Sequence, residues 1–302
     1  MENLQHFLAG WGAGTFGVLV GYPMDTIKTY QQMSNIKLST HETVSMIINK
    51  DGVRGLYKGM LFPLLGSGLL NSVYFGVYDV FLKEFQSLRG YAKVHPTNAG
   101  WMQDLFIAGS IGGAAQALIT CPSELIKIRM QLGKGVPKTV LALKPAFNNV
   151  STYQTVLDMH RRYGFGYFFI GLVPTIWRDA VNGGIYIVSY QFGRHYMYGE
   201  LNINPGLFEI FVAGGLAGIV SWIPVVPFDT IKSRMQADDF DKRKYKGMIS
   251  CSLELFKVAS YHGFFKGFIM ITARSIPVNI AIIYGYELIL WLCKGIDNSN
   301  LK

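Results

Sequence analysis

The residues Pro-Met-Asp-Thr-Ile-Lys at 23–28 return as Pro-Ser-Glu-Leu-Ile-Lys at 122–127 and as Pro-Phe-Asp-Thr-Ile-Lys at 227–232. A Gly-xxx-Gly pair precedes each proline by the same interval, at Gly10 and Gly14, Gly109 and Gly113, and Gly214 and Gly218. A glutamine follows each lysine by four residues, at Gln32, Gln131 and Gln236. The same order and spacing in three places indicates an internal repeat.

A second element follows in each repeat. It begins at a glycine after an aromatic residue and reaches a tyrosine 19 positions later, at Gly59 and Tyr78, Gly171 and Tyr190, and Gly267 and Tyr286. The repeated unit is therefore helix, connector, helix. We expect three such repeats, over 1–95, 96–202 and 203–302, that form one integral domain.

The composition favours a membrane protein. Half of the 302 residues are apolar and only 16% are charged, which is unusual for a soluble domain of this length. Glycine, proline and polar residues interrupt the apolar runs, as in helices that face lipid on one side and a polar cavity on the other. We predict an all-α membrane protein of six transmembrane helices in three pseudo-symmetric repeats. The predicted helices span 5–33, 60–86, 104–132, 171–197, 208–236 and 268–293, with short connector helices at 40–50, 151–162 and 247–260.

The net charge of +9 comes largely from the connectors. The basic connector residues are Lys50, Arg54, Lys58, Lys134, Lys138, Lys144, Arg161, Arg162, Lys242, Arg243, Lys244 and Lys246. An even number of spans places both termini on one side, and we expect these basic connectors on the other, next to anionic lipid. Nucleic-acid binding is disfavoured because no recognised binding module accompanies the basic residues.

Other classes of protein find little support. The three cysteines and six histidines show no spacing typical of a disulfide framework, a metal site or a catalytic triad. We therefore expect no metal, no cofactor and no enzymatic activity. The N-terminus runs into an apolar segment without an Arg-rich presequence or a signal-peptide cleavage site, so any targeting information is expected to be internal.

The repeated acids and bases predict an ionic closure of the pathway. Six unpaired charges at membrane depth would each cost roughly 2.5–3.5 kcal/mol. Prolines that kink the odd-numbered helices would bring these charges toward a common axis, where they pair between repeats. The alternative is that they lie among lipid headgroups as solvated anchors. The residues concerned are Asp25, Lys28, Glu124, Lys127, Asp229 and Lys232.

The opposite end of the repeats is less regular. The equivalent pairs there are Tyr78-Asp79, Tyr190-Gln191 and Tyr286-Glu287, and the residues three positions further are Leu82, Arg194 and Leu290. Only Asp79 or Glu287 can pair with Arg194 in this set. A weaker closure is therefore expected at this end.

These motifs resemble the mitochondrial carrier family from about Phe7 to Leu292. The family's following base is present at Arg129 and Arg234, whereas Tyr30 replaces it in the first repeat. The acid-glycine motif of the connectors is altered in the second repeat, at Tyr163-Gly164, and shortened in the third, at His262-Gly263.

The resemblance implies an alternating-access carrier of the inner mitochondrial membrane. It implies a matrix gate with the pairs Asp25–Lys127, Glu124–Lys232 and Asp229–Lys28, braced by Gln32, Gln131 and Gln236. It also implies a cytoplasmic gate in which Asp79 pairs with Arg194, braced by Tyr78, Tyr190 and Tyr286, and Glu287 is the other acid that we expect at this gate. Cardiolipin at the matrix-side helix ends and a monomeric state are expected.

Positions at which the repeats differ indicate the substrate site. Seven and eight residues past the repeat glycines lie Gly66 and Ser67, Arg178 and Asp179, and Arg274 and Ser275. Two arginines suit a carboxylate and Asp179 suits a cation, although Arg178 and Asp179 could simply neutralise one another. Trp222, Trp177 and Tyr186 offer aromatic faces for a methylated ammonium group, or ordinary packing surfaces.

The same residues resemble the carnitine/acylcarnitine and basic amino acid branch of the family, together with the segments at 214–222 and 273–279. The resemblance implies a transporter of a small carboxylate-bearing cation or zwitterion such as carnitine or acylcarnitine. The alternatives are basic or methylated amino acids, choline-like cations, a proton-leak protein suggested by the thinned cytoplasmic gate, and a non-transporting scaffold.

Overall fold

The computed structural model describes residues 2–34, 38–90, 100–131, 152–199, 207–239 and 243–299, and the regular elements within these ranges are all helical. The helices of the bundle are α1 (Glu2–Met33), α3 (Leu61–Arg89), α4 (Trp101–Gln131), α6 (Leu172–Gly199), α7 (Leu207–Trp222), α8 (Val226–Ala237) and α10 (Phe268–Ser299). Short helices α2 (Thr40–Asp51), α5 (Thr152–Tyr163) and α9 (Met248–Ala259) lie in the connectors. Each short helix is followed by a 3₁₀ turn, at Val53–Tyr57, Phe165–Phe169 and Tyr261–Gly263.

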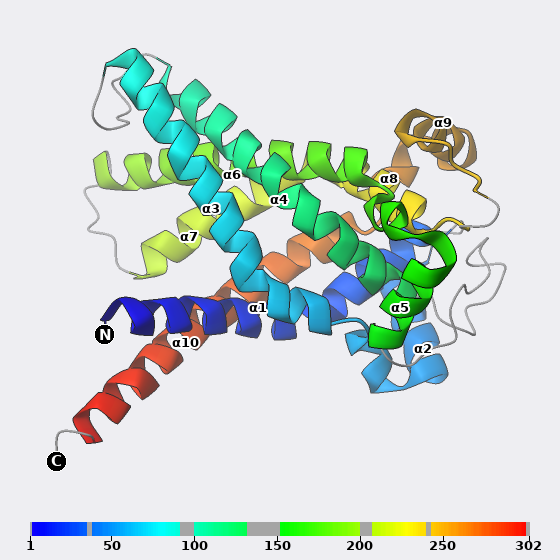
Figure 1. The fold of residues 1–302 in the computed structure, drawn as a ribbon, viewed down its shortest axis with the longest axis horizontal. Coiled ribbons are helices and arrows are strands. Elements are labelled where there is room, and N and C mark those ends of the chain that lie inside the picture. The colour runs from blue at the N-terminus through cyan, green and yellow to red at the C-terminus, as the bar shows by residue number, and fades with distance from the viewer. Residues whose placement is uncertain are drawn as a thin grey trace.

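The two ends of the bundle differ. Helix α1 begins and α10 ends at the same end, at the left of Figure 1, whereas α2, α5 and α9 lie at the opposite end. The described basic connector residues belong to those short helices or lie next to them, as Arg161, Arg162 and Lys244 illustrate. The basic connectors therefore lie opposite the ends of α1 and α10, as expected, while Lys134, Lys138, Lys144 and Lys242 fall outside the described residues.

The predicted helix at 208–236 is wrong as a single element. It is broken after Trp222 and restarts at Val226 as α8. Pro224 and Pro227 lie three residues apart, and each proline lacks an N–H and clashes with the carbonyl four residues before it. Pro23 and Pro122 are single prolines, and α1 and α4 continue through them. The pair of prolines therefore separates α7 from α8, whereas a single proline leaves α1 and α4 continuous.

Small residues join α4 to α6. A Cβ atom at Gly113 would lie 2.0 Å from the backbone oxygen of Asp179, and one at Gly109 would lie 2.8 Å from that of Gly183. These backbones can therefore approach only because both side chains are absent, which is how small residues drive helix packing in lipid. At the repeat-equivalent Gly218, nothing in the described part of the chain lies within 4 Å of such a Cβ. The close contact expected in every repeat is thus present in the second repeat and absent at Gly218.

Three equivalent glycines lie just before or near the starts of α3, α6 and α10, the second helix of each repeat. Gly59, Gly171 and Gly267 have φ angles of +80°, +81° and +81°, a conformation that side chains disfavour. A Cβ on Gly59 would lie 3.2 Å from the Cα of Lys127, and one on Gly267 would lie 3.1 Å from the Cγ of Lys28. The second helix of each repeat (α3, α6 or α10) therefore begins against the first helix of another repeat.

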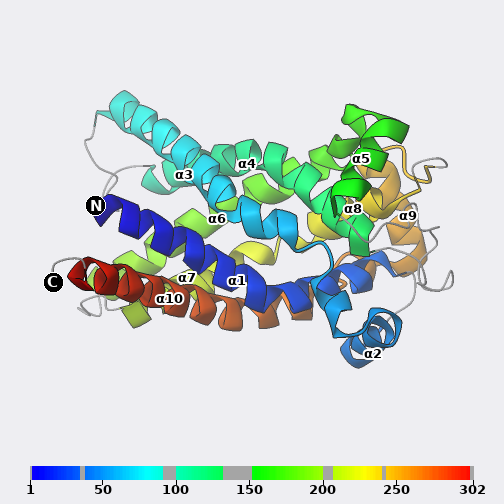
Figure 2. The same ribbon diagram turned by 60° about the horizontal axis from the view of Figure 1, so that its bottom comes forward.

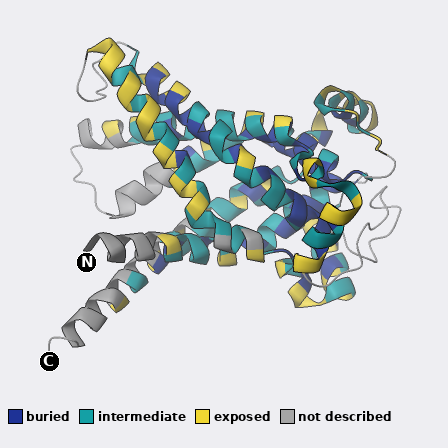
Figure 3. Ribbon diagram, in the orientation of Figure 1, coloured by how far each residue is buried: buried dark blue, intermediate teal, exposed yellow. Residues whose placement is uncertain are grey.

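Burial is concentrated at the end with the short helices. Most residues of α8 are buried there, and they include charged and polar side chains such as Asp229, Lys232 and Arg234. Figure 3 shows exposed residues along α3 and on the outer short helices. Two helical stretches of the described residues, Trp101–Gln131 and Tyr261–Ile282, are long and apolar enough to cross a membrane. The polar core places the chemistry of the chain near the short-helix end of the bundle.

Candidate functional site

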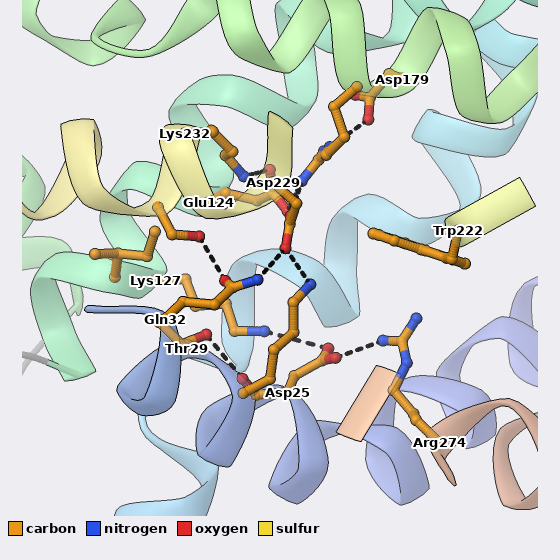
Figure 4. Close-up of a pocket in the computed structure, with 14 residues that line it drawn as sticks. Asp25, Thr29, Gln32, Glu124, Lys127, Asp179, Trp222, Asp229, Lys232 and Arg274 are labelled. Atoms are coloured by element: carbon orange, nitrogen blue, oxygen red, sulfur yellow. Dashed lines mark hydrogen bonds and ion pairs between the residues drawn. The ribbon is translucent and has the colours of Figure 1, made fainter. Parts of the chain in front are cut away.

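The acids and bases of the repeated motif form three ion pairs near one another in the bundle. Lys28 Nζ lies 2.7 Å from Asp229 Oδ2, and Lys127 Nζ lies 3.3 Å from Asp25 Oδ2. Lys232 pairs with Glu124. Each pair joins two different repeats, so the three together link α1, α4 and α8 (Figure 4). These are the pairings that the family resemblance implied, and the charges do not lie as solvated headgroup anchors.

Two arginines, one from α6 and one from α10, extend this network. Arg178 Nη1 lies 2.9 Å from Glu124 Oε1 and 3.2 Å from Asp229 Oδ1. Arg274 Nη1 donates to Asp25 Oδ1 at 2.6 Å. Every acid of the motif therefore contacts a lysine and an arginine. Sequence reasoning assigned the arginines to the substrate alone and missed their contact with these acids.

Arg178 also pairs with its neighbour in sequence, Asp179, with 2.7 Å between Nε and Oδ1. Adjacent helical residues usually point in different directions, but the long arginine side chain folds back across that gap. The neutralising interpretation thus holds for one oxygen of Asp179. The other oxygen, Oδ2, is buried and has no hydrogen-bond partner among the residues that the structure describes. An unsatisfied buried carboxylate oxygen is a strong acceptor for an incoming donor or cation.

A cavity of about 150 Å³ lies among these groups. Its charged lining side chains are Asp25, Glu124, Asp179 and Asp229, and Lys28, Lys127, Lys232, Arg178 and Arg274. Cations therefore exceed acids by one. Trp222, the last residue of α7, also lines the cavity. The volume is below the roughly 300–1,000 Å³ of pockets for drug-sized ligands, so the site suits a small polar molecule.

Some of the predicted substrate residues lie elsewhere. Gly66 and Ser67 are not among the residues that line this cavity, and Ser67 instead faces Gly14 of α1. Trp177 is 55% exposed and stacks on Phe228, outside the cavity. The position of a residue along a helix predicts its depth in the bundle but not whether it faces the axis. Gly66 and Ser67 of α3 therefore do not line the cavity, although they are equivalent by repeat to Arg178 and Asp179.

The three repeated glutamines have different partners. Gln32 donates to Asp229 Oδ2 at 2.6 Å and so braces the Lys28–Asp229 pair. Gln131 donates to the hydroxyl of Thr26, and Gln236 to backbone carbonyls of α4 and the turn after α5. For Gln131 and Gln236 the described contacts therefore do not include the ion pairs that they were expected to brace.

The residue two positions before each of these glutamines links the C-terminal ends of α1, α4 and α8. Tyr30 donates to the carbonyl of Gln131 at 2.6 Å, Arg129 donates to that of Asp238, and Arg234 donates to that of Gln32 at 3.1 Å. The last carbonyls of a helix lack partners within the helix, so these donors satisfy them across repeats. Tyr30 thus replaces the usual base without loss of the contact, because a hydroxyl also donates.

Replacing Tyr30 by phenylalanine is expected to lower the free energy of unfolding by about 1–3 kcal/mol, since the buried carbonyl of Gln131 loses a donor. Thermal unfolding of the purified protein in detergent measures this effect. Tyr153→Phe is the matched control, because Tyr153 is 74% exposed. Equal unfolding temperatures for the two variants would contradict the assigned role.

At the other end, Asp79 pairs with Lys83 on its own helix, with 2.5 Å between Oδ2 and Nζ. Lys83 has no equivalent lysine in the other repeats, where His195 and Trp291 occupy its position, so repeat symmetry did not indicate this pair. Tyr78 stacks on Tyr74, and Tyr190 stacks on Tyr186. The side chains of Arg194, Tyr286 and Glu287 lie outside the described residues.

Comparison with known proteins agrees with the threefold repeat. The family model described as mitochondrial carrier protein matches residues 1–88, 99–201 and 204–294. Solute carrier family 25 member 45 of Mus musculus is 35% identical over 96% of this chain and 99% of its own length. Solute carrier family 25 member 48 of Danio rerio is 31% identical, over 95% and 97% of the two chains. A protein named mitochondrial basic amino acids transporter, from Rattus norvegicus, is 31% identical over 97% and 91%.

Three matches of one family model, near-complete coverage by relatives and an all-helical fold point to the same conclusion. Members of this family are multi-pass transporters rather than enzymes. The chain belongs to the mitochondrial carrier family and is a transporter of the mitochondrial inner membrane.

Proposed function

We propose that this carrier transports a small zwitterion that bears a carboxylate and an ammonium group, such as carnitine or acylcarnitine. The observation that supports it is that Arg178, Arg274 and Asp179 line one cavity, and that the buried Oδ2 of Asp179 has no hydrogen-bond partner among the described residues. A guanidinium group binds a carboxylate with two parallel hydrogen bonds, and a buried carboxylate oxygen attracts a cation. Trp222 adds an aromatic face for a methylated ammonium.

The balance of charge favours a zwitterion over a net cation. The lining side chains already carry one more positive than negative charge. A choline-like cation would add to that excess and would leave both arginines without a new acceptor. A zwitterion adds no net charge, and its two groups match the two kinds of side chain.

Basic or methylated amino acids are the nearest alternative substrates. One relative carries the name mitochondrial basic amino acids transporter. The α-carboxylate of such a molecule would suit Arg274, and its ammonium would suit Asp179. A second, side-chain cation would enter a cavity in which cations already exceed acids, and this supports carnitine-type substrates as the first choice.

The three inter-repeat ion pairs are proposed to act as the gate toward the matrix. They lie at the end of the bundle that carries the basic short helices, and Gln32 braces one of them. A second gate toward the cytoplasm is proposed for Asp79, Arg194 and Glu287 with Tyr78, Tyr190 and Tyr286. In this structure Asp79 pairs with Lys83 of its own helix.

Uptake into proteoliposomes tests the substrate. We expect saturable uptake of carnitine or a short acylcarnitine, with slower uptake of lysine and of choline. Asp179→Asn is expected to reduce carnitine uptake roughly 10–100-fold, because it removes the anionic acceptor while keeping the shape of the side chain. Glu84→Gln is the control, since Glu84 is exposed on α3.

Two results would contradict the proposal. Uptake of keto acids or nucleotides without uptake of any carnitine-type or amino acid substrate would overturn the substrate class. Ohmic conductance in planar bilayers, independent of added substrate, would favour the proton-leak alternative that the thinned cytoplasmic gate suggests.

Anionic lipid is the proposed partner on the matrix side, with cardiolipin as the example, and the carrier is proposed to act as a monomer. A cavity of about 830 Å³ lies between the start of α2, at Ser39 and Thr40, and the start of α10, at Lys266 and Gly267. Helix N-termini and a lysine favour anionic headgroups, which supports this assignment.

A further inference from the structure

The ring of Trp222 already has a cation of the protein itself over it. Lys28 Nζ lies 4.8 Å from the centroid of the Trp222 ring and 2.7 Å from Asp229 Oδ2. Both Lys28 and Trp222 line the cavity, and Figure 4 shows Trp222 beside the cluster of ion pairs. Lys28 therefore contacts, at once, the aromatic face proposed for the substrate and an acid of the proposed matrix gate.

A substrate ammonium and the Lys28 ammonium compete for this ring. A cation is attracted to an aromatic face only within about 6 Å of its centroid, and two cations at that range repel one another. A substrate that brings its ammonium group to Trp222 thus meets Lys28 there. The two groups cannot both hold the position that Lys28 occupies in the structure.

We propose that Lys28 is an internal occupant of the ammonium side of the site, and that the substrate's ammonium group displaces it from Trp222. The displacement weakens the Lys28–Asp229 pair, so binding at the ring loosens one of the three inter-repeat ion pairs. This inference rests on the proposed function and adds to it a route by which the ligand itself would release the matrix side.

The carboxylate of a zwitterion acts on a second ion pair. Arg274 is 30% exposed in its side chain and holds Asp25 through one Nη1 contact. A substrate carboxylate at Arg274 would draw that guanidinium from Asp25. A zwitterion therefore loosens two pairs, at Asp229 and at Asp25, whereas a cation without a carboxylate loosens only the first.

The second repeat offers a matched comparison. Lys127 Nζ lies 4.2 Å from the centroid of the Tyr22 ring and pairs with Asp25. Tyr22, however, is only 1% exposed and is not among the residues that line the cavity. A ligand can reach Trp222 but not Tyr22. Removing Lys28 should therefore open an aromatic face to the ligand, and removing Lys127 should not.

Isothermal titration of the purified carrier with choline tests this, because choline carries the ammonium group without the carboxylate. The dissociation constant for choline is expected to be roughly tenfold lower in Lys28→Gln than in Lys127→Gln, because both substitutions remove one positive charge from the cavity lining and only the first uncovers the Trp222 ring. Both substitutions free one gate acid, so the difference between them reports the ring. Trp222→Leu is expected to raise the dissociation constant roughly tenfold and to cancel the gain in the double variant.

Equal affinities in Lys28→Gln and Lys127→Gln, or weaker binding in Lys28→Gln than in the unchanged protein, would overturn the inference. Size-exclusion elution and thermal unfolding identify any variant that has lost its fold, and Trp222→Leu, which keeps all three ion pairs, then tests the ring alone. Carnitine uptake by the unchanged protein separates the two proposals. If carnitine is taken up but Lys28→Gln does not bind choline more tightly, only the displacement is contradicted. If the protein neither takes up carnitine nor binds choline, the proposed function is contradicted as well.

Discussion

Replacing Arg178 by alanine is expected to reduce carnitine uptake by roughly 100-fold or more. Arg178 is 5% exposed and contacts Asp179, Glu124 and Asp229. Removing one partner of a buried charge network costs about 3–5 kcal/mol, because the remaining charges lose their compensation. The three acids would then repel one another around the cavity, and the carboxylate of the substrate would lose its partner.

Initial rates of carnitine uptake, normalised to the amount of inserted protein, measure this effect. Arg178→Lys keeps the charge but presents three donors at a single point instead of a planar fork, and it is expected to recover only part of the rate. Arg161→Ala is the matched control, because Arg161 is exposed on α5. Full uptake by Arg178→Ala would show that Arg178 neither binds substrate nor supports the ion pairs.

Replacing Gly113 by alanine is expected to lower the free energy of unfolding by about 3 kcal/mol, at the upper end of the usual cost of overpacking. The added Cβ would lie 2.0 Å from the backbone oxygen of Asp179, and a backbone atom cannot turn aside as a side chain can. Helices α4 and α6 would have to separate. Because Arg178 and Asp179 lie on α6 at this contact, uptake should fall with stability.

The repeat itself supplies the control for this substitution. Gly218 lies at the position of the third repeat that corresponds to Gly113, and no described atom lies within 4 Å of a Cβ placed there. Gly218→Ala is therefore expected to leave the unfolding temperature nearly unchanged, whereas Gly113→Ala is expected to lower it by roughly 5 °C or more. The same change in unfolding temperature for both variants would contradict the packing argument.

The sequence predicted the fold well because its signals are periodic. The constant spacings around Pro23, Pro122 and Pro227 recur in three places, and the ends of most helices follow from them within a few residues. The break at 223–225 is the exception. The prediction treated Pro227 as equivalent to the other two prolines and gave no weight to Pro224. Two prolines three residues apart remove two backbone N–H donors and add two steric clashes within one helical turn.

The site was predicted in part. Repeat symmetry indicated Asp25, Lys28 and their equivalents, and the structure joins them as the resemblance implied. Symmetry could not show that Arg274 reaches Asp25 or that Lys28 lies over Trp222, since these contacts join residues far apart in sequence. It was misleading for Gly66 and Ser67, which share a register with Arg178 and Asp179 but do not line the same cavity.

The sequence by itself determined the threefold repeat, the membrane class and the identity of the residues that carry charge at the axis, because spacing and composition are properties of the chain alone. Only the tertiary structure decided which face of each helix meets the cavity, which arginine contacts which acid, and that one oxygen of Asp179 lacks a hydrogen-bond partner within the described ranges. The physical reason is that helix rotation and the reach of long side chains depend on packing between helices. Gly113 illustrates this dependence, because it sets how closely α4 approaches α6.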